Sequence, residues 1–332
     1  MSWQWHCNWW RCFAQPLRAD LCFYAGYSDA QLVGIAPLYL TTTWRRGVLV
    51  RSLQLIGNSW HESQVAFSEY GDVLALPGYA DEFRRRVLET IRVAHRPTEI
   101  VIGNTRSGAG WLRALNDVSV NRGYMRQVDG MISYQADLSA GMPAYLRSLG
   151  ASTRRALWHK RRRLASLGKI RLESVAARDI PSAFADLNRL HRLRWGAPAF
   201  AGNALAFHEA FAQSVANNSE LAMSRLWVGD RLVSVLYDVV KSTTQYNLKL
   251  GFDPGFAPGV SLGLLHFGYA LERAAERDVQ RYDFLGGNGK LSESKSHLSQ
   301  LRQQLVTLQV LPGRRLAGLY RAYDWWRGRF RS

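Results

Sequence analysis

A strand, a turn-rich loop and a helix follow one another directly over residues 244–276, and this junction restricts the fold more than any other feature. Gly255, Pro258 and Gly259 end an apolar, strand-like segment, and apolar side chains then return at helical spacing. Such a junction presents several backbone N–H groups at the start of a helix, where an anion such as pyrophosphate can bind. The loop lacks both the Gly-Lys-Ser/Thr of a Walker loop and the glycine spacing of a Rossmann fingerprint.

Helices and strands alternate around this junction in an order that predicts a mixed α/β fold. In the second half, apolar periodicity predicts helices over 181–195, 204–215 and 261–276, and strands over 221–228, 232–240, 244–250, 279–285 and 304–311. Gly229-Asp230 predicts a hairpin turn between the first two of these strands. In the first half, the same reasoning predicts strands over 21–26, 31–40, 48–56, 98–103 and 126–138, and helices over 81–95 and 110–118.

The composition changes near residue 139, where small residues precede Pro143, a residue suited to the first turn of a helix. We therefore predict an N-terminal domain over 1–138 and a second domain over 139–312. A basic C-terminal helix is expected over 313–332, because this segment carries six Arg and one acidic residue.

Charge is the strongest compositional signal, with 43 Lys and Arg against 26 Asp and Glu and a net charge of +17. Such a field favours anionic partners: a phosphorylated cofactor, an acidic carrier protein, nucleic acid or anionic lipid. Residues 147–171 hold nine basic and no acidic residues, and a helix is expected there from a Ser152 cap to Gly168. Its narrow apolar stripe consists of Leu157, Leu164 and Leu167. The stretch is therefore an RNA-binding helix, a membrane-surface helix or a solvated helix docked by that stripe.

The remaining composition excludes several protein classes. A hydrophobic fraction of 47% with twelve Trp excludes a disordered chain. No apolar run approaches the roughly 18 residues of a spanning helix, and the first residues lack the pattern of a signal peptide. We therefore expect a cytoplasmic protein, with the inner membrane surface as an additional place of binding. Cys7, Cys12 and Cys22 are odd in number and lie close together, which predicts reduced thiols rather than a disulfide framework or a zinc site.

Seven short motifs lie along the chain in a fixed order. They are Trp3-x-Trp5 with Trp9-Trp10, Leu32 to Leu38, Glu69 to Asp72, Leu190-His191-x-x-Arg194-Trp195, Gly202 to Phe207-His208, Tyr246 with Gly251 to Pro254 and Pro258-Gly259, and Tyr282 to Gly287 followed by Lys295. Each resembles a motif of the CelD/BcsL-type acetyltransferases, a branch of the GNAT superfamily. The resemblance covers nearly the whole chain.

Three departures accompany this resemblance. The usual GNAT loop reads Gln/Arg-x-x-Gly-x-Gly/Ala, whereas 256–261 keeps the central Gly259. The Tyr-Lys of the family is Ser294-Lys295 here, after a longer loop. Because the chain begins directly at the Trp block, we expect a further N-terminal strand in the natural protein.

The resemblance implies two tandem GNAT-like halves, as in the FemABX peptidyltransferases, each a mixed, mostly antiparallel sheet flanked by helices. It also implies acyl transfer from acetyl-CoA or another acyl-CoA, with no metal. The gap between the strands of Tyr246 and Tyr282 would hold the pantetheine arm, and the following loop would face the pyrophosphate. The implied cofactor-binding residues are Asn247, Lys249, Phe256, Pro258, Gly259, Val260, Ser261 and Gly263.

Acyl transfer to an amine needs a base, a group that polarises the thioester carbonyl, and a proton donor for the leaving thiolate. His191 is the first candidate for the base, because histidine titrates near neutrality; the alternative is a histidine packed beside Trp195. Asp283 is a second candidate or a structural partner of a basic residue, because a buried carboxylate must be paired. Tyr246 is the candidate acid, or else a core residue.

Three further residues are candidates for binding the acceptor. Arg194 and Lys295 could hold an anionic group, and each could instead pair with a carboxylate or remain solvated. Trp195 could stack on a sugar ring or pack in the core.

The leading function is acyl transfer, with acetyl as the expected group, to an amine or hydroxyl of a polysaccharide precursor, amino sugar or related metabolite. One rival is a FemABX-like transferase that uses aminoacyl-tRNA. Another is a catalytically degenerate basic adaptor at a membrane or in an envelope-polysaccharide complex. Within the enzyme class, an acidic acyl carrier protein could replace CoA as the donor.

Overall fold

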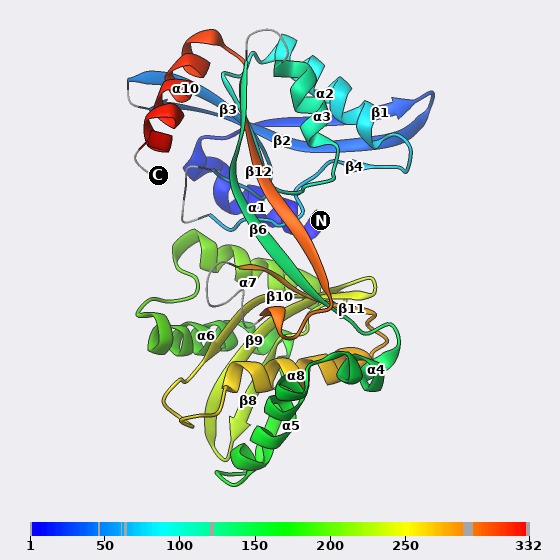
Figure 1. Ribbon diagram of the computed structural model, residues 1–332, viewed down its shortest axis with the longest axis vertical. Coiled ribbons are helices and arrows are strands. Elements are labelled where there is room, and N and C mark those ends of the chain that lie inside the picture. Colours follow the sequence, from blue (N-terminus) through cyan, green and yellow to red (C-terminus); the bar gives the residue numbers. More distant parts are fainter. Residues whose placement is uncertain are drawn as a thin grey trace. The chain divides into compact units, whose positions relative to one another are not determined.

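The computed structural model describes residues 2–45, 47–60, 62, 65–119, 123–287 and 295–329. Contacts divide the chain into two compact units, Met1–Met131 with Gln304–Ser332 (the N-terminal unit) and Ile132–Gln303 (the central unit) (Figure 1). The domain boundaries expected from the sequence, after residues 138 and 312, stay a prediction; the contact division falls after 131 and 303. Ser294, named in the motif comparison, and residues 330–332 of the expected C-terminal helix lie outside the described residues.

The N-terminal unit is a mixed sheet flanked by helices. Its elements are α1 (Trp3–Leu17), β1 (Asp20–Ser28), β2 (Gln31–Arg45), β3 (Val48–Leu55), β4 (Leu74–Ala75), α2 (Ala80–Ala94), β5 (Glu99–Arg106), α3 (Trp111–Ser119), most of β12 (Leu301–Leu311) and α10 (Arg314–Arg329), with the start of β6 (Tyr124–Asp137). The strand order is β1-β2-β3-β5-β12-β6, with β4 beside β2. Strands β3 and β5 pair in parallel, whereas the pairs β1/β2, β2/β3, β2/β4 and β5/β12 are antiparallel.

Helix α1 was not expected from the sequence, which identified its tryptophans only as a motif. Ser2 caps it by accepting a hydrogen bond from the Trp5 backbone N–H at 3.2 Å. Trp9 is fully buried and packs on Tyr39, and its indole N–H donates to the Ala66 carbonyl at 2.7 Å. The motif tryptophan at this position therefore acts as a core residue of the N-terminal unit.

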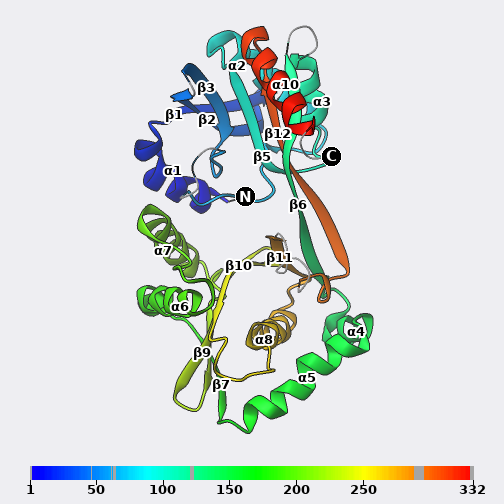
Figure 2. The same ribbon diagram turned by 60° about the vertical axis from the view of Figure 1, so that its left-hand side comes forward.

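The central unit places one sheet between two layers of helices. Its elements are α4 (Gly141–Ser148), α5 (Ala151–Ala165), β7 (Ile170–Ser174), a 3₁₀ turn (Ala177–Asp179), α6 (Ile180–Trp195), α7 (Gly202–Ala216), β8 (Ser224–Val228), β9 (Arg231–Lys241), β10 (Thr244–Phe252), α8 (Leu262–Glu276) and β11 (Arg281–Gly287). The strand order is β6-β11-β10-β9-β8-β7. Helices α6 and α7 cover one face, and α4, α5 and α8 lie on the other (Figure 2).

Alternation along β9 explains the two faces of this sheet. Tyr237 packs against Phe184 of α6 with ring centroids 5.0 Å apart. Its neighbour Leu236 belongs to the core cluster that contains Leu271 of α8. Successive side chains of a strand point to opposite faces, so β9 is buried on both sides. The mixed α/β fold expected from the sequence is confirmed.

The predicted helix limits around the basic stretch are wrong. Helix α5 begins after Gly150, which caps it without a side-chain hydrogen bond, so Ser152 lies inside the first turn. The helix ends at Ala165, before Gly168, and the chain then forms β7, which the sequence did not predict. Leu157 and Leu164 are fully buried, whereas Leu167 lies beyond the helix and is 52% exposed. The apolar stripe of the helix therefore consists of two leucines, Leu157 and Leu164.

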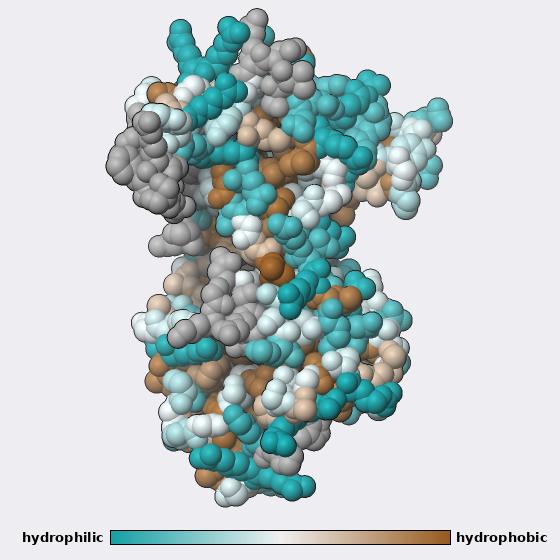
Figure 3. Space-filling model, viewed as in Figure 1, coloured by the Kyte–Doolittle hydropathy of each residue, from teal (hydrophilic) through white to brown (hydrophobic). Residues whose placement is uncertain are grey.

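Some basic residues of α5 form hydrogen bonds with neighbouring elements, and others are exposed to solvent. The Arg161 guanidinium donates to both oxygens of Glu272 on α8, and Arg154 donates to carbonyls at the end of α4. Arg155, Arg162 and Arg163 are exposed. Hydrophilic residues gather around α5 at the bottom of Figure 3. Within the described residues, no helix is both long enough and apolar enough to cross a membrane.

Candidate functional site

Strands β10 and β11 pair in parallel over three residues and then separate. The pairs are Thr244 with Arg281, Gln245 with Tyr282 and Tyr246 with Asp283. Strand β10 continues to Phe252 beside β9, with an irregularity between Asn247 and Lys249 that leaves Leu248 as an extra residue. Beyond Tyr246 the edge of β10 facing β11 is therefore free of strand partners in the described sheet. Bulges of this kind are frequent beside active sites, because they redirect side chains and end pairing.

One buried carboxylate ties the two separating strands together. Asp238 of β9 is fully buried and accepts hydrogen bonds from Gln245 (2.6 Å) and Asn247 (2.7 Å) of β10. It also accepts one from the Tyr282 hydroxyl of β11 at 2.6 Å. Burial raises the pKa of Asp238 to about 6, although these three donors lower it. The sequence analysis missed this residue; the signal was a single charge within an otherwise uncharged strand, 232–240.

Asp283 lies at the point of separation, and it is held by neutral donors. Its carboxylate accepts from the Ser133 hydroxyl (2.9 Å), the Gln135 side-chain amide (2.9 Å) and the backbone N–H of Leu285 (2.8 Å). Leu285 has a φ of 56°, a conformation that costs free energy for a residue with a branched side chain. Asp283 therefore fixes a strained turn in β11 beside the gap. Whether it also acts as a base stays a prediction.

Lys295 approaches the same turn. Its ammonium group donates to the backbone carbonyls of Leu285 (3.1 Å) and Gly286 (2.7 Å). Tyr246, the predicted acid, occupies the last paired position of β10 and is half-buried. The structure thus brings Tyr246, Asp283 and Lys295 to one end of the β10/β11 pairing.

His191 lies in the last turn of α6, close to β10. Its Nδ1 is 2.7 Å from the Ala197 carbonyl, and since a carbonyl only accepts, Nδ1 carries the proton. In the neutral ring, Nε2 is then the basic nitrogen. Burial lowers the pKa of His191, as do the positive charges of Lys249 and Arg194 to a smaller extent. His191 is thus a neutral base at pH 7.

The absence of a side chain at Gly251 allows α6 to lie this close to β10. A Cβ built at Gly251 would be 2.9 Å from the Leu187 carbonyl oxygen and 3.4 Å from the His191 backbone nitrogen. The first distance is shorter than real Cβ contacts, and backbone atoms cannot give way cheaply. Gly251, which the sequence identified only as part of a motif, therefore helps to place His191.

Arg194, Lys249 and Trp195 surround His191. The Arg194 guanidinium stacks on Trp195 at 4.8 Å and on Phe252 of β10 at 4.5 Å. The Lys249 ammonium lies 5.8 Å from the centre of the Phe200 ring. Burial lowers the pKa of both basic groups. Arg194 pairs with no carboxylate among the described residues, since it instead lies between two aromatic rings.

The loop between β10 and α8 is held by side-chain contacts at its beginning, and at its end no side chain caps α8. Asp253 accepts from the Gly255 backbone N–H at 2.9 Å and pairs with Arg231 at 2.7 Å. Gly259 has a φ of 79°, and Ser261 precedes α8 without a capping hydrogen bond from its side chain. The N–H groups of the first turn of a helix have no partner within that helix, so this turn can receive an anion.

The predicted cofactor residues occupy different parts of this region. Gly263 lies in the first turn of α8, where a Cβ would approach Leu250 and Phe252 at 3.0 Å, so the absence of a side chain allows α8 to pack closely on β10. Asn247 has its side chain committed to Asp238. The remaining predicted members belong to the loop or to β10: Lys249, Phe256, Pro258, Gly259, Val260 and Ser261. For all eight predicted residues, contact with a cofactor stays a prediction.

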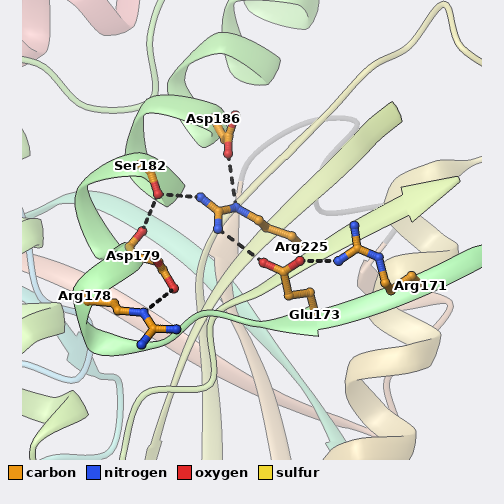
Figure 4. Close-up of polar contacts among 7 residues, drawn as sticks. All are labelled: Arg171, Glu173, Arg178, Asp179, Ser182, Asp186 and Arg225. Atoms are coloured by element: carbon orange, nitrogen blue, oxygen red, sulfur yellow. Dashed lines mark hydrogen bonds and ion pairs between the residues drawn. The ribbon is translucent and has the colours of Figure 1, made fainter. Parts of the chain in front are cut away.

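Near the start of α6, unlike at its end, a basic side chain is paired with carboxylates. Arg225 of β8 donates to Asp186 (3.1 Å), Glu173 (3.4 Å) and the Ser182 hydroxyl (2.8 Å). Figure 4 shows this network, in which Arg171 also pairs with Glu173. Basic charge near the start of α6 is thus neutralised by carboxylates and serves structure.

Comparison with known proteins places this site within a recognised domain. Residues 151–291 match the family model described as acetyltransferase (GNAT) domain. No curated protein sequence matches the chain. Residues 151–291 therefore resemble a GNAT acetyltransferase domain.

Solved structures extend the likeness to the whole chain. A crystal structure of FemX matches with a TM-score of 0.64 and 10% identity, covering 95% of this chain and 92% of that one. The C-terminal domain of a putative lysylphosphatidylglycerol synthetase from Agrobacterium fabrum gives 0.54 and 12%, covering 95% and 89%. L-PGS from Bacillus licheniformis gives 0.52 and 10%, covering 87% and 83%. At these identities the likenesses establish the fold, and the CelD/BcsL type stays a prediction.

Proposed function

We propose that the protein is a GNAT-type N-acyltransferase that moves an acyl group, normally acetyl, from a CoA thioester to an amine. The single observation that carries this proposal is the separation of β10 and β11 directly after Tyr246 and Asp283, with a bulge at Leu248. The pantetheine arm would lie along the free edge of β10, and the pyrophosphate would meet the loop at Gly259 and the first turn of α8. The match of residues 151–291 to the GNAT domain supports this arrangement.

In the proposed reaction, the acceptor nitrogen attacks the thioester carbonyl carbon; a C–N bond forms and the C–S bond breaks. His191 Nε2 accepts the proton that the nitrogen loses. A backbone N–H of the bulged segment 247–249 polarises the carbonyl oxygen. Tyr246 gives a proton to the CoA thiolate as it leaves. The CelD/BcsL resemblance suggests an acceptor among amino sugars or polysaccharide precursors, including a hydroxyl acceptor.

Thermal stabilisation tests the donor assignment. Acetyl-CoA and free CoA are expected to raise the melting temperature, and the shift should persist at moderate salt, because part of the contact is to the uncharged pantetheine arm. If the shift in melting temperature disappears with salt, it indicates non-specific electrostatic binding to a chain with a net charge of +17. The absence of any shift would contradict the proposal.

A second donor, aminoacyl-tRNA, is favoured by one observation: Arg155, Arg162 and Arg163 are exposed on α5. Replacement of these three by Glu tests it better than replacement of Arg161, because Arg161 pairs with Glu272 within the fold. On this alternative, tRNA binds the unmodified protein at low salt, its affinity falls steeply with salt, and the triple variant loses it. If no tRNA binds at low salt, CoA or an acidic acyl carrier protein remains as the donor.

A further inference from the structure

His191, Arg194 and Lys249 form a group of basic side chains beside the proposed site, called here the basic cluster. Two of its members belong to the last turns of α6 and one to β10 directly after the bulge. Lys249 and Arg194 both lower the pKa of His191, so each lies within electrostatic range of His191. Arg194 and His191 also share a ring neighbour, since the Arg194 guanidinium is 4.8 Å and the His191 ring 6.3 Å from the centre of the Trp195 ring. Lys249 also lowers the pKa of the buried His208, which falls to about 3 mainly through burial, so His208 is neutral.

No carboxylate contacts this cluster within the part of the chain that the structure describes. Arg194 and Lys249 contact aromatic rings, and His191 contacts a backbone carbonyl. Arg225, at the other end of α6, has two carboxylates instead (Figure 4). Arg225 is thus neutralised within the fold, whereas the exposed Arg194 and the half-buried Lys249 have no carboxylate partner in the described part of the chain, so a ligand can supply the negative charge.

The unpaired cations of the basic cluster also determine which acceptors are attracted to it. Desolvation of a cation without a carboxylate costs free energy, and part of this cost is recovered when an anion binds. An acceptor amine that is an ammonium ion in water would be repelled by Lys249 and Arg194. An acceptor that also carries a carboxylate or phosphate would be attracted, and its amine would come close to His191.

We propose that Arg194 and Lys249 bind the anionic group, carboxylate or phosphate, of the acceptor amine beside His191. This inference rests on the proposed acyl transfer and narrows its substrate class to amines that carry an anion. Arg194 supplies a planar fork suited to two parallel hydrogen bonds, and Lys249 supplies a point charge. The neutral His191 is left to accept the proton.

The chain contains only six lysines, which makes a direct test practical. Lysines labelled by reductive ¹³C-methylation give few NMR signals, and the signal absent from Lys249→Met identifies Lys249. The probes are glycine, its neutral amide glycinamide, and inorganic phosphate. Glycine or phosphate should shift the Lys249 signal in a saturable way and raise the pKa of that amine, whereas glycinamide should not; the two anions separate a carboxylate from a phosphate preference.

Controls distinguish the cluster from general attraction to a basic chain. Lys241, which pairs with Glu220 at 2.8 Å, should keep its signal unchanged. Arg194→Leu should weaken anion binding by about tenfold or more, because it removes the charge-assisted hydrogen bonds of the guanidinium. Arg192→Leu, which removes another exposed arginine of the same helix, should leave anion binding unchanged.

Equal shifts with glycine and glycinamide, or no saturable shift with either anion, would overturn the inference. The donor site is measured separately by the stabilisation that acetyl-CoA gives. Acetyl-CoA binding without anion binding would remove the acceptor assignment alone. Anion binding without any response to acetyl-CoA would instead remove the acyl transfer, and with it the acceptor role of the cluster.

Discussion

Asp238 of β9 and Tyr282 of β11 are joined across the strand that lies between them, with the Tyr282 hydroxyl 2.6 Å from the carboxylate. The same carboxylate receives the side-chain amides of Gln245 and Asn247 from the intervening β10. Three strands are therefore fixed by one buried charge just before β10 and β11 separate. The four residues hold the gap at a defined width, because moving either strand would leave a buried donor without its acceptor.

The pH dependence of stability should report this carboxylate. The folded pKa of Asp238 is about 6 and its ordinary value 3.8, so the folded state holds an extra proton between these values. The resulting stabilisation is fully present below about pH 4 and is lost as the pH rises through 6. In urea unfolding, the free energy of wild type minus that of Asp238→Asn should therefore fall by about 2 kcal/mol from pH 4 to pH 7.

The control for this measurement is Asp230→Asn, which changes an exposed acidic residue in the hairpin turn before β9. Its difference from wild type should not vary in the same window. A difference for Asp238→Asn that stays flat with pH would contradict the assignment of a raised pKa.

His191→Ala should lower kcat by about a hundredfold to ten-thousandfold, because it removes the proposed proton acceptor. The protein should stay folded, since His191 is only half-buried. Release of CoA from acetyl-CoA with a working acceptor measures the effect, and Arg192→Ala on the same turn is the control. Normal turnover by His191→Ala would exclude it as the base.

The pH profile gives an independent check of the same residue. The pKa of His191 is lowered from 6.5 by burial and by its two basic neighbours. The base form therefore persists below pH 6.5, and kcat/KM should fall only at more acidic pH. In Lys249→Met one of these positive charges is gone, so the acidic limb should move to higher pH.

Gly251→Ala should destabilise the protein by about 1–3 kcal/mol and lower activity together with stability. The added Cβ would lie 2.9 Å from the Leu187 carbonyl, so α6 must move away from β10 and carry His191 with it. Gly108→Ala is the control, because a Cβ there meets nothing within 4 Å. Equal chemical-denaturation midpoints for the two variants would show that the close approach is not needed.

Gly259→Trp should abolish the stabilisation given by acetyl-CoA by filling the loop that faces the pyrophosphate. Gly47→Trp provides the matched control, because Gly47 has the same φ of 79° and a Cβ there meets nothing within 4 Å. Both variants bear similar backbone strain, and only the first should lose the ligand response. Unchanged stabilisation of Gly259→Trp would remove the loop from the cofactor site.

Helices with a strong apolar period were predictable in position and type. The periods around Phe184, Phe207 and Leu265 gave α6, α7 and α8, because burial of one face determines helices of this length. Gly229-Asp230 gave the hairpin of β8 and β9. Helix α1 and strand β7 were missed, because the first is a run of aromatic residues and the second is a short segment within a basic stretch.

The candidate site was only partly predictable. His191 and Asp283 were found from residue type and motif, whereas Asp238 lay within an apolar strand with nothing to indicate its partners. Its three donors come from two other strands, and the register that brings them together depends on the bulge at Leu248. The proximity of Lys249 to His191 likewise depends on the bulge at Leu248, which sets the position of Lys249 on β10.

The sequence by itself determined the helices and strands with a clear apolar period, the excess of positive charge and the motifs that resemble a GNAT domain, because these depend on neighbours along the chain. Only the tertiary structure decided that Asp238 joins three strands and that His191, Arg194 and Lys249 share one location. Such relations depend on strand register and on the close approach of α6 to β10 at Gly251. Both arise from packing between segments that are far apart in the chain.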